Sequence, residues 1–336
     1  MGKKFLIVIL LLVVICSSAF FIKKYNDNQK IKNEIEAQEE LNKQGVVLVL
    51  LAGSNYESKG KLNSEGYLLK TRNGEIIVVD GGRYTDAEEL SFYIKKFGNG
   101  KVDHWYLTHG HNDHVGALNE ILNNDAYKDI KIKNIYHTLL SDEWYKANDK
   151  RGYESEHSIL MALEEHKDRY ENVIIPKKGE IYSHDNVKSH ILRVADPEVT
   201  NSDNGNDSGL VWKFEFTDVN KSMIFLGDAF LAISKELLEN PEVLKADYVQ
   251  MAHHGQSGVT QEVYQAIKPS VCFYNCPEWL YNNDIGTGYN SGPWKSVEVR
   301  KWMEEIGVKE SYKAFEGTQI FKINSNGLEK RSLDNI

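Results

Sequence analysis

Thr108-His109-Gly110-His111-Asn112-Asp113-His114-Val115-Gly116 is the stretch on which the interpretation of the whole sequence depends. It places three histidines and one aspartate within six residues, directly after the apolar run Trp105-Tyr106-Leu107, which predicts a strand. Imidazole and carboxylate groups suit zinc, manganese and iron, and a loop at a strand end can aim several of them at one point. A solvated polar loop is the alternative, but this density of ligand types favours a metal site.

Further residues of ligand type follow apolar runs elsewhere in the chain. The run Ser222–Leu226 predicts a strand and leads into Asp228, and the run Ala246–Ala252 leads into His253-His254-Gly255. Asp228 has a plainer interpretation as the N-cap of the helix expected after it. Its place at a strand end, well after the histidine cluster, favours a second carboxylate arm instead. Asp80-Gly81-Gly82 also ends an apolar run, and alone it indicates only a turn.

This order of motifs resembles the metallo-β-lactamase superfamily, and within it the ComEC-type branch of DNA-uptake proteins. The resemblance covers roughly residues 46–323 and implies an α/β fold, an αββα sandwich. It also implies two divalent ions, with Zn²⁺ expected first and Mn²⁺ as the alternative. By this resemblance the first ion is held by His109 and His111, the second by Asp113, His114 and His254, with Asp228 between them and Asp80 bracing the loop from beneath.

The chain departs from the family pattern in the loop before the strand Leu210–Phe214. Many members supply a further histidine to the first metal there, and this loop has none. Asn206, Asp207 or Ser208 is expected to take that position, unless the first metal is held more weakly. His253 is a further candidate, as a group that contacts the substrate or supports a ligand.

A second departure concerns the substrate. ComEC-type members carry a Gly-His-Pro segment where this chain has Tyr289-Asn290-Ser291-Gly292-Pro293, which weakens the case for DNA. The same region is rich in aromatic residues, which pack in most proteins but can also line a pocket for a cationic group. A choline-phosphate esterase branch of the superfamily uses such a pocket. The residues concerned are Tyr274, Trp279, Tyr281, Tyr289 and Trp294.

The sequence divides into four parts. Residues 1–24 contain an apolar run from Phe5 to Ile22 flanked by lysines, which predicts a transmembrane anchor or a cleaved signal segment. Residues 25–44 form a polar stalk, residues 45–325 the hydrolase domain and residues 326–336 a polar tail. We expect the domain to lie outside the membrane, either anchored or secreted. The net charge of −9 argues against a broad non-specific nucleic-acid surface, although a local nucleic-acid site stays open.

Together these features predict a binuclear hydrolase that uses a metal-bridged hydroxide on a phosphodiester, either nucleic acid or a phosphorylcholine-type small molecule. Asp113 and Asp228 are the expected catalytic carboxylates, because Asp113 can also orient the attacking water. Two alternatives remain: a membrane-tethered binding module with a vestigial metal site, and a hydrolase of thioester or lactam substrates. The sequence does not indicate the oligomeric state.

Overall fold

The computed structural model describes residues 2, 24–26, 28–33, 44–56, 62–198 and 204–335. The chain divides into two units, residues 1–44 and residues 45–336. In the first unit, residues 24–26 and 28–33 are helical and exposed. The predicted segment from Phe5 to Ile22 lies outside the described residues. Within the part of the chain that is described, no helix combines the length and apolar character needed to cross a membrane.

Two sheets form the centre of the second unit. The first has eight strands in the order β15-β14-β1-β2-β3-β4-β5-β6. Their bounds are β1 Val46–Leu50, β2 Gly66–Lys70, β3 Ile76–Asp80, β4 Lys101–Tyr106, β5 Lys131–Tyr136, β6 Tyr170–Ile174, β14 Gln319–Asn324 and β15 Gly327–Arg331. The second has seven strands in the order β13-β12-β11-β10-β9-β8-β7. Their bounds are β7 Ile181–His184, β8 Val187–Arg193, β9 Val211–Phe216, β10 Lys221–Phe225, β11 Tyr248–Gln250, β12 Val271–Tyr274 and β13 Glu310–Lys313.

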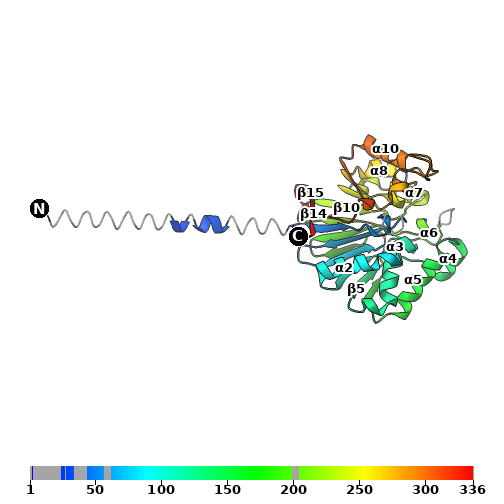
Figure 1. The fold of residues 1–336 in the computed structure, drawn as a ribbon, viewed down its shortest axis with the longest axis horizontal. Helices are drawn as coiled ribbons and strands as arrows, with labels where there is room; N and C mark the ends of the chain where they lie inside the picture. The colour runs from blue at the N-terminus through cyan, green and yellow to red at the C-terminus, as the bar shows by residue number, and fades with distance from the viewer. Residues whose placement is uncertain are drawn as a thin grey trace. The chain divides into compact units, whose positions relative to one another are not determined.

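Helices cover the outer face of each sheet, with α2, α3 and α5 on the first and α7, α8 and α10 on the second (Figure 1). The bounds are α2 Ala87–Gly98, α3 Asn112–Asn123, α4 Asp142–Asn148, α5 Tyr153–Glu165, α6 Asn204–Asp207, α7 Leu231–Leu238, α8 Gln261–Ile267, α9 Glu278–Tyr281 and α10 Ser296–Ile306. The 3₁₀ turns are η1 Gly53–Asn55, η3 Tyr84–Asp86, η4 Asp125–Tyr127, η5 Pro241–Leu244, η6 Ala252–Gly255, η7 Ala314–Glu316 and η8 Leu333–Asn335.

Strand β1 shows why the sequence folds into layers. Successive side chains of a strand point to opposite faces, and here Leu48 belongs to the core between the two sheets whereas Val49 belongs to the core beneath the helices. A strand buried on both faces needs a continuous apolar run, which Val46–Leu50 supplies. The inter-sheet core also holds Trp212 and Phe225, both fully buried. The observed two-sheet α/β architecture agrees with the expected sandwich.

The end of the domain corrects one prediction. Residues 326–336 are not only a polar tail, because β15 pairs antiparallel with β14 and extends the first sheet at its edge. The short connection between Asn324 and Gly327 closes this hairpin, and Gly327 has φ +128°. Main-chain hydrogen bonds hold an edge strand whose side chains are largely exposed, so apolar patterning gave no signal for it.

The topology explains where the polar strand ends meet. Strands β3 and β4 are parallel, and so are β10 and β11, so each pair brings two carboxyl ends to one edge of its sheet. Strand β2 runs antiparallel to β3, with Gly66 opposite Asp80, so the start of β2 reaches the same edge. Glu65 precedes that start directly.

Candidate metal centre

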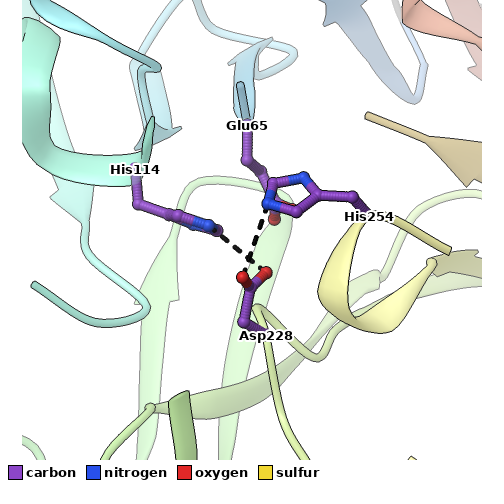
Figure 2. A group of neighbouring side chains, drawn as sticks. All are labelled: Glu65, His114, Asp228 and His254. Atoms are coloured by element: carbon purple, nitrogen blue, oxygen red, sulfur yellow. Dashed lines mark ion pairs between the residues drawn. The ribbon is translucent and has the colours of Figure 1, made fainter. Parts of the chain in front are cut away.

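Four buried side chains converge from four separate segments of the second unit. Glu65, His114, Asp228 and His254 each place one nitrogen or oxygen within 4.8 Å of the others, and Figure 2 shows all four pointing at a common centre. His114 Nε2 lies 3.2 Å from Asp228 Oδ1, and His254 Nε2 lies 3.4 Å from Asp228 Oδ2. This group is the candidate second metal position.

Asp113 completes the second position. Its Oδ2 lies 3.3 Å from His254 Nε2, and Asn63 Nδ2 donates a hydrogen bond to the same oxygen. Arg83 stands behind it, with a guanidinium nitrogen 3.6 Å from Oδ2. Asp113 therefore faces both the candidate ligands and a cation. Burial would raise the pKa of its carboxyl group, but the hydrogen bond from His254 and the neighbouring His114 lower it well below the usual range.

The candidate first position shares Asp228 with the second. His109, His111 and Asp228 each place one ligand-type atom within 4.8 Å of the others. The rings of His109 and His111 lie 4.5 Å apart between centroids, and those of His109 and His114 lie 4.1 Å apart. The structure thus brings together the six residues predicted as ligands, with Asp228 central to both groups. Their roles as ligands are part of the proposal below.

Hydrogen bonds to one nitrogen of each ring select the nitrogen that remains for a ligand. His114 Nδ1 lies 2.8 Å from Asp80 Oδ2, and His254 Nδ1 lies 2.8 Å from the carbonyl oxygen of Asn275. Each oxygen accepts a hydrogen bond from Nδ1–H, so the lone pair of the neutral ring lies on Nε2. For His111 the pattern is reversed, because Nε2 lies 2.8 Å from Asp149 Oδ2 and Nδ1 keeps the lone pair.

Asp80 braces the histidine loop as expected. Its two oxygens accept hydrogen bonds from the backbone nitrogen and the hydroxyl of Thr108, each at 2.7 Å, in addition to the contact with His114. The side chain is fully buried, and the residue adopts a left-handed conformation with φ +54°. Aspartate tolerates this conformation better than most residues do. The fixed carboxylate then orients the loop and one ring of the cluster.

A strained turn presents the last histidine. His253 and His254 both have positive φ, +50° and +60°, inside the 3₁₀ turn η6. Such backbone geometry costs on the order of 1–3 kcal/mol for each non-glycine residue and is found mostly at functional sites. Gly255 follows with φ +80°, and a Cβ there would lie 2.4 Å from the ring of Tyr274. Only glycine fits this close approach, which explains the His-His-Gly pattern.

Electrostatics favour positive charge at the second position. Burial alone would lower the pKa of His254, but Asp228 and Asp113 raise it to about 10. His114 behaves alike: burial would lower its pKa, yet Asp228 and Asp80 raise it well above the usual range. Burial and the neighbouring imidazoles of His114 and His111 lower the pKa of His109. The carboxylates thus favour positive charge at His114 and His254, whereas His109 is neutral and able to donate its lone pair.

The donor set fits divalent metal ions on one further observation. Nε2 of His109, His114 and His254 is buried and has no hydrogen-bond partner, and the same holds for one oxygen of Asp228 and one of Glu65. Buried polar atoms without partners cost about 1–3 kcal/mol each and are rare in folded proteins. Five such atoms in one cluster, all of them ligand types, match a site built to coordinate ions.

The loop before β9 does not supply a histidine, and its residues have different uses. Asp207 Oδ1 accepts a hydrogen bond from the backbone nitrogen of Phe230 at 3.0 Å, just before α7. One oxygen of Asp207 is thus engaged at the N-terminus of α7, and a ligand role for Asp207 stays a prediction. Ser208 donates to the carbonyl of Gly205. Asn206 stays near the site, with Nδ2 3.5 Å from His253 Nε2.

His253 lies at the rim of the centre. Its Nδ1 lies 2.6 Å from the carbonyl oxygen of Ser257, and its Nε2 lies 3.9 Å from Asp228 Oδ2. The side chain is 19% exposed, whereas that of His254 is fully buried. This position suits a group that meets a substrate better than it suits an inner ligand.

Three acidic residues at the centre were missed by sequence reasoning: Glu65, Asp149 and Glu156. Glu65 receives a hydrogen bond from Gln250 Nε2 at 2.8 Å, and burial raises its pKa well above the usual range. Asp149 and Glu156 approach His111 from the segment that contains α4 and α5. The only available signal for Glu65 was its place one residue before a strand.

The aromatic region expected near the centre is partly filled by the protein itself. The guanidinium of Arg300 lies 4.1 Å from the ring centroid of Tyr281 and 5.7 Å from that of Tyr289. Trp279 and Trp294 contact each other, with ring centroids 4.9 Å apart. These contacts weaken the case for a phosphorylcholine pocket, because an internal cation already occupies the tyrosine faces.

The layered fold and the histidine–aspartate cluster define a metallo-β-lactamase-like protein. The family described as the metallo-beta-lactamase superfamily matches residues 61–269, more than half of the chain, and the chain belongs to this superfamily. It is also similar to ComE operon protein 3 of Bacillus subtilis (strain 168), with 26% identity over 178 residues. That match covers 53% of this chain but only 20% of the relative. It agrees with the ComEC-type resemblance of the motifs.

Solved structures are similar to this chain at low identity. CmlA, a diiron beta-hydroxylase from Streptomyces venezuelae, is 14% identical with a TM-score of 0.50, and the match covers 83% of this chain and 54% of CmlA. The metallo-beta-lactamase fold protein YhfI from Bacillus subtilis is also 14% identical, with a TM-score of 0.48 and coverage of 81% and 98%. At an identity this low, the CmlA match shows the fold alone.

Proposed function

We propose that the chain is a binuclear metal-dependent hydrolase that acts on phosphodiesters. The observation that carries the proposal is the convergence of buried, unpartnered ligand atoms from His109, His114 and His254 around Asp228. Asp228 belongs to both ligand groups, so it is the residue expected to lie between two ions. His109 and His111 would hold the first ion, and Asp113, His114, His254 and Glu65 the second.

Divalent ions at these positions would lower the pKa of a bound water and withdraw charge from a phosphoryl oxygen, so no serine or cysteine nucleophile is required. The chain's own residues prepare the site. Asp80 and Asn275 fix the rings of His114 and His254 in the tautomer that exposes Nε2. Asp113, held by Asn63 and Arg83, is placed to accept a proton from the attacking water. His253 at the rim is placed to contact the substrate.

A phosphodiester is favoured over other esters because two neighbouring positions sharing one carboxylate suit a displacement in which attacking and leaving oxygens are both stabilised. Nucleic acid remains one phosphodiester option, and the net charge of −9 favours short or small substrates over long duplexes. Anchoring outside the membrane through residues 1–24 stays a prediction.

The test is a substrate panel with the purified, zinc-loaded full-length chain: bis-nitrophenyl phosphate, nitrophenyl phosphorylcholine, single-stranded DNA, a thioester and a β-lactam. We expect hydrolysis of a phosphodiester at least tenfold above that of the thioester and lactam. His111→Ala and Asp228→Ala should lose both bound metal and turnover, whereas His166→Ala, remote from the cluster, should keep both.

Two results would contradict the proposal. A wild-type chain that binds metal but hydrolyses nothing would support a tethered binding module with a vestigial site. Preferential turnover of the thioester or lactam would replace the phosphodiester with the other substrate class, while leaving the metal chemistry in place.

A further inference from the structure

The ring of His111 is held from behind by a carboxylate that belongs to none of the family motifs. Asp149 follows directly after α4, and its Oδ2 lies 2.8 Å from His111 Nε2. Its other oxygen, Oδ1, accepts hydrogen bonds from the backbone nitrogens of Arg151 and Gly152, each at 3.1 Å. Both oxygens are therefore acceptors, one for the ring and one for the turn that leads into α5.

A second carboxyl group stands beside the first. Glu156 in α5 is fully buried, and neither of its oxygens has a hydrogen-bond partner. Its Oε1 lies 3.9 Å from His111 Nε2. A buried carboxyl group without partners is costly, so its place beside His111 needs an explanation other than packing.

Glycines allow the backbone to close around this group. A Cβ on Gly152 would lie 2.5 Å from His111 Nε2, and a Cβ on Gly205 would lie 2.4 Å from the same atom and 1.9 Å from Asp149 Oδ2. Gly110 also has no room for a side chain, because a Cβ there would lie 2.7 Å from the side chain of Glu156. Gly205 belongs to the loop from which the third histidine is missing. The loop that lacks the ligand thus packs directly on the His111–Asp149 pair.

We infer that Asp149, supported by Glu156, is the positioning residue of the first metal site, where it compensates for the absent third histidine. Asp149 Oδ2 accepts a hydrogen bond from Nε2 of His111, and Glu156 lies beside this pair, so Nε2 carries the proton and Nδ1 keeps its lone pair for the ion. A ring turned by 180° would set carbon atoms against both carboxyl groups. With one imidazole fewer, the fixed orientation of His111 decides how tightly the first ion is held. The inference rests on the proposed metal centre.

The Asp149→Asn variant tests it sharply. An amide has one acceptor and one donor end, whereas Asp149 accepts from the ring on one side and from two backbone nitrogens on the other. In either orientation, the NH₂ group of the amide therefore faces another N–H donor, which is either the His111 ring or the backbone nitrogens of Arg151 and Gly152. Glu156→Gln is the second variant, and it leaves the turn at Asp149 untouched.

The matched control is Asp142→Asn. Asp142 in α4 forms a pair of the same kind with His157 in α5, at 2.7 Å, and neither residue belongs to the ligand groups. This variant removes one carboxylate from a His–Asp pair that joins α4 to α5. It leaves the metal centre unchanged.

The experiment titrates the metal-free full-length chain with Zn²⁺ by calorimetry and with Co²⁺ by visible absorption. Wild type should bind two equivalents. Asp149→Asn should weaken one equivalent by about 10- to 100-fold and leave the other unchanged, Glu156→Gln should weaken the same equivalent, and Asp142→Asn should match wild type. Thermal unfolding of the metal-free variants shows whether each one is folded.

Folded Asp149→Asn and Glu156→Gln variants that bind both equivalents like wild type would overturn the inference. So would a third equivalent in wild type that only these variants lose, because it would make the pair ligands of a separate ion. The outcomes remain distinct from failure of the proposed function. A wild type that binds two ions without hydrolysing a phosphodiester refutes the function only, and a wild type that binds no metal refutes the centre itself.

Discussion

Glu65 shows how a single buried carboxyl group can be explained only by its neighbours. Its side chain is fully buried, one oxygen accepts a hydrogen bond from Gln250, and the other has no partner. Gln250 in turn accepts hydrogen bonds from the backbone nitrogens of Leu226 and Gly227, just before Asp228. Glu65 is thus tied to the strand end that carries the shared carboxylate, and its free oxygen faces His114 and His254 (Figure 2).

The Glu65→Gln variant should therefore weaken zinc binding at the second position by at least about tenfold, because it keeps the size of the side chain but removes a negative donor. Calorimetric titration of the metal-free chain measures this change. Glu75→Gln is the control, since Glu75 lies just before β3, next to His104 and outside the ligand groups. Equal zinc affinity in Glu65→Gln and wild type would remove Glu65 from the site.

Residues differ in how far the sequence alone reveals them. Asp228 and His254 could be chosen because each follows an apolar strand and lies beside glycine. Glu65 could not, because it stands in a polar loop and its partner Gln250 is 185 positions away. For Asp207 the sequence offers the residue type and the loop but not the contact: its Oδ1 accepts a hydrogen bond from the backbone nitrogen of Phe230, just before α7.

At the scale of elements, strand ends position most of the centre and the helical segment α4–α5 contributes its unexpected part. The parallel pairs β3–β4 and β10–β11 bring their carboxyl ends to the site, which follows from apolar runs that the sequence displays. The contribution of the segment α4–α5 could not be predicted. Asp149 lies in a polar stretch of sequence, and nothing local indicates that it contacts His111. Edge strand β15 was hidden as well, since its side chains are largely exposed.

The close packing of these elements leads to a prediction for the loop before β9. Gly205→Ala places a Cβ 2.4 Å from His111 Nε2 and 1.9 Å from Asp149 Oδ2, so the loop must move away from the pair. We expect a loss of about 1–3 kcal/mol in the free energy of unfolding of the metal-free chain and weaker binding of one zinc equivalent. Urea unfolding and zinc titration measure the two effects. A variant with wild-type values in both would show that the loop does not pack on His111.

At the scale of the whole molecule, two histidine rings lie against each other between the sheets. His104 in β4 and His184 in β7 belong to different sheets, and their ring centroids lie 3.7 Å apart. Burial and the neighbouring His104 lower the pKa of His184 to about 3, and the hydroxyl of Tyr106 lies 2.6 Å from His184 Nε2. The sandwich therefore folds around a neutral His184.

This core predicts how stability depends on pH. The unfolded chain takes up a proton at His184 near pH 6.5, whereas the folded chain does so only near pH 3, so the stabilisation is complete above pH 6.5 and is lost as the pH falls towards 3. Between pH 7.5 and pH 5 the loss from this residue is about 2 kcal/mol. Urea unfolding of the metal-free chain at both values measures it. His184→Gln should reduce the difference and His166→Gln should not; an unchanged difference in His184→Gln would contradict the assignment.

The two halves of the sandwich meet at the candidate metal centre, so we expect stability to depend on bound ions. Glu65, His109 and His114 lie next to the ends of β2 and β4 or in α3, on the side of the first sheet, whereas Asp228 and His254 follow β10 and β11 of the second. An ion that binds this set binds only the folded chain, and zinc at 100 times its dissociation constant adds about 2.7 kcal/mol per site. Removing metal with a chelator should therefore lower the unfolding midpoint, and added zinc should restore it. In the Asp228→Ala/His254→Ala double variant, chelator and zinc should have little effect on the midpoint. If that variant responded to zinc as strongly as wild type, the stabilising ion would lie elsewhere and the two sheets would not be joined through this centre.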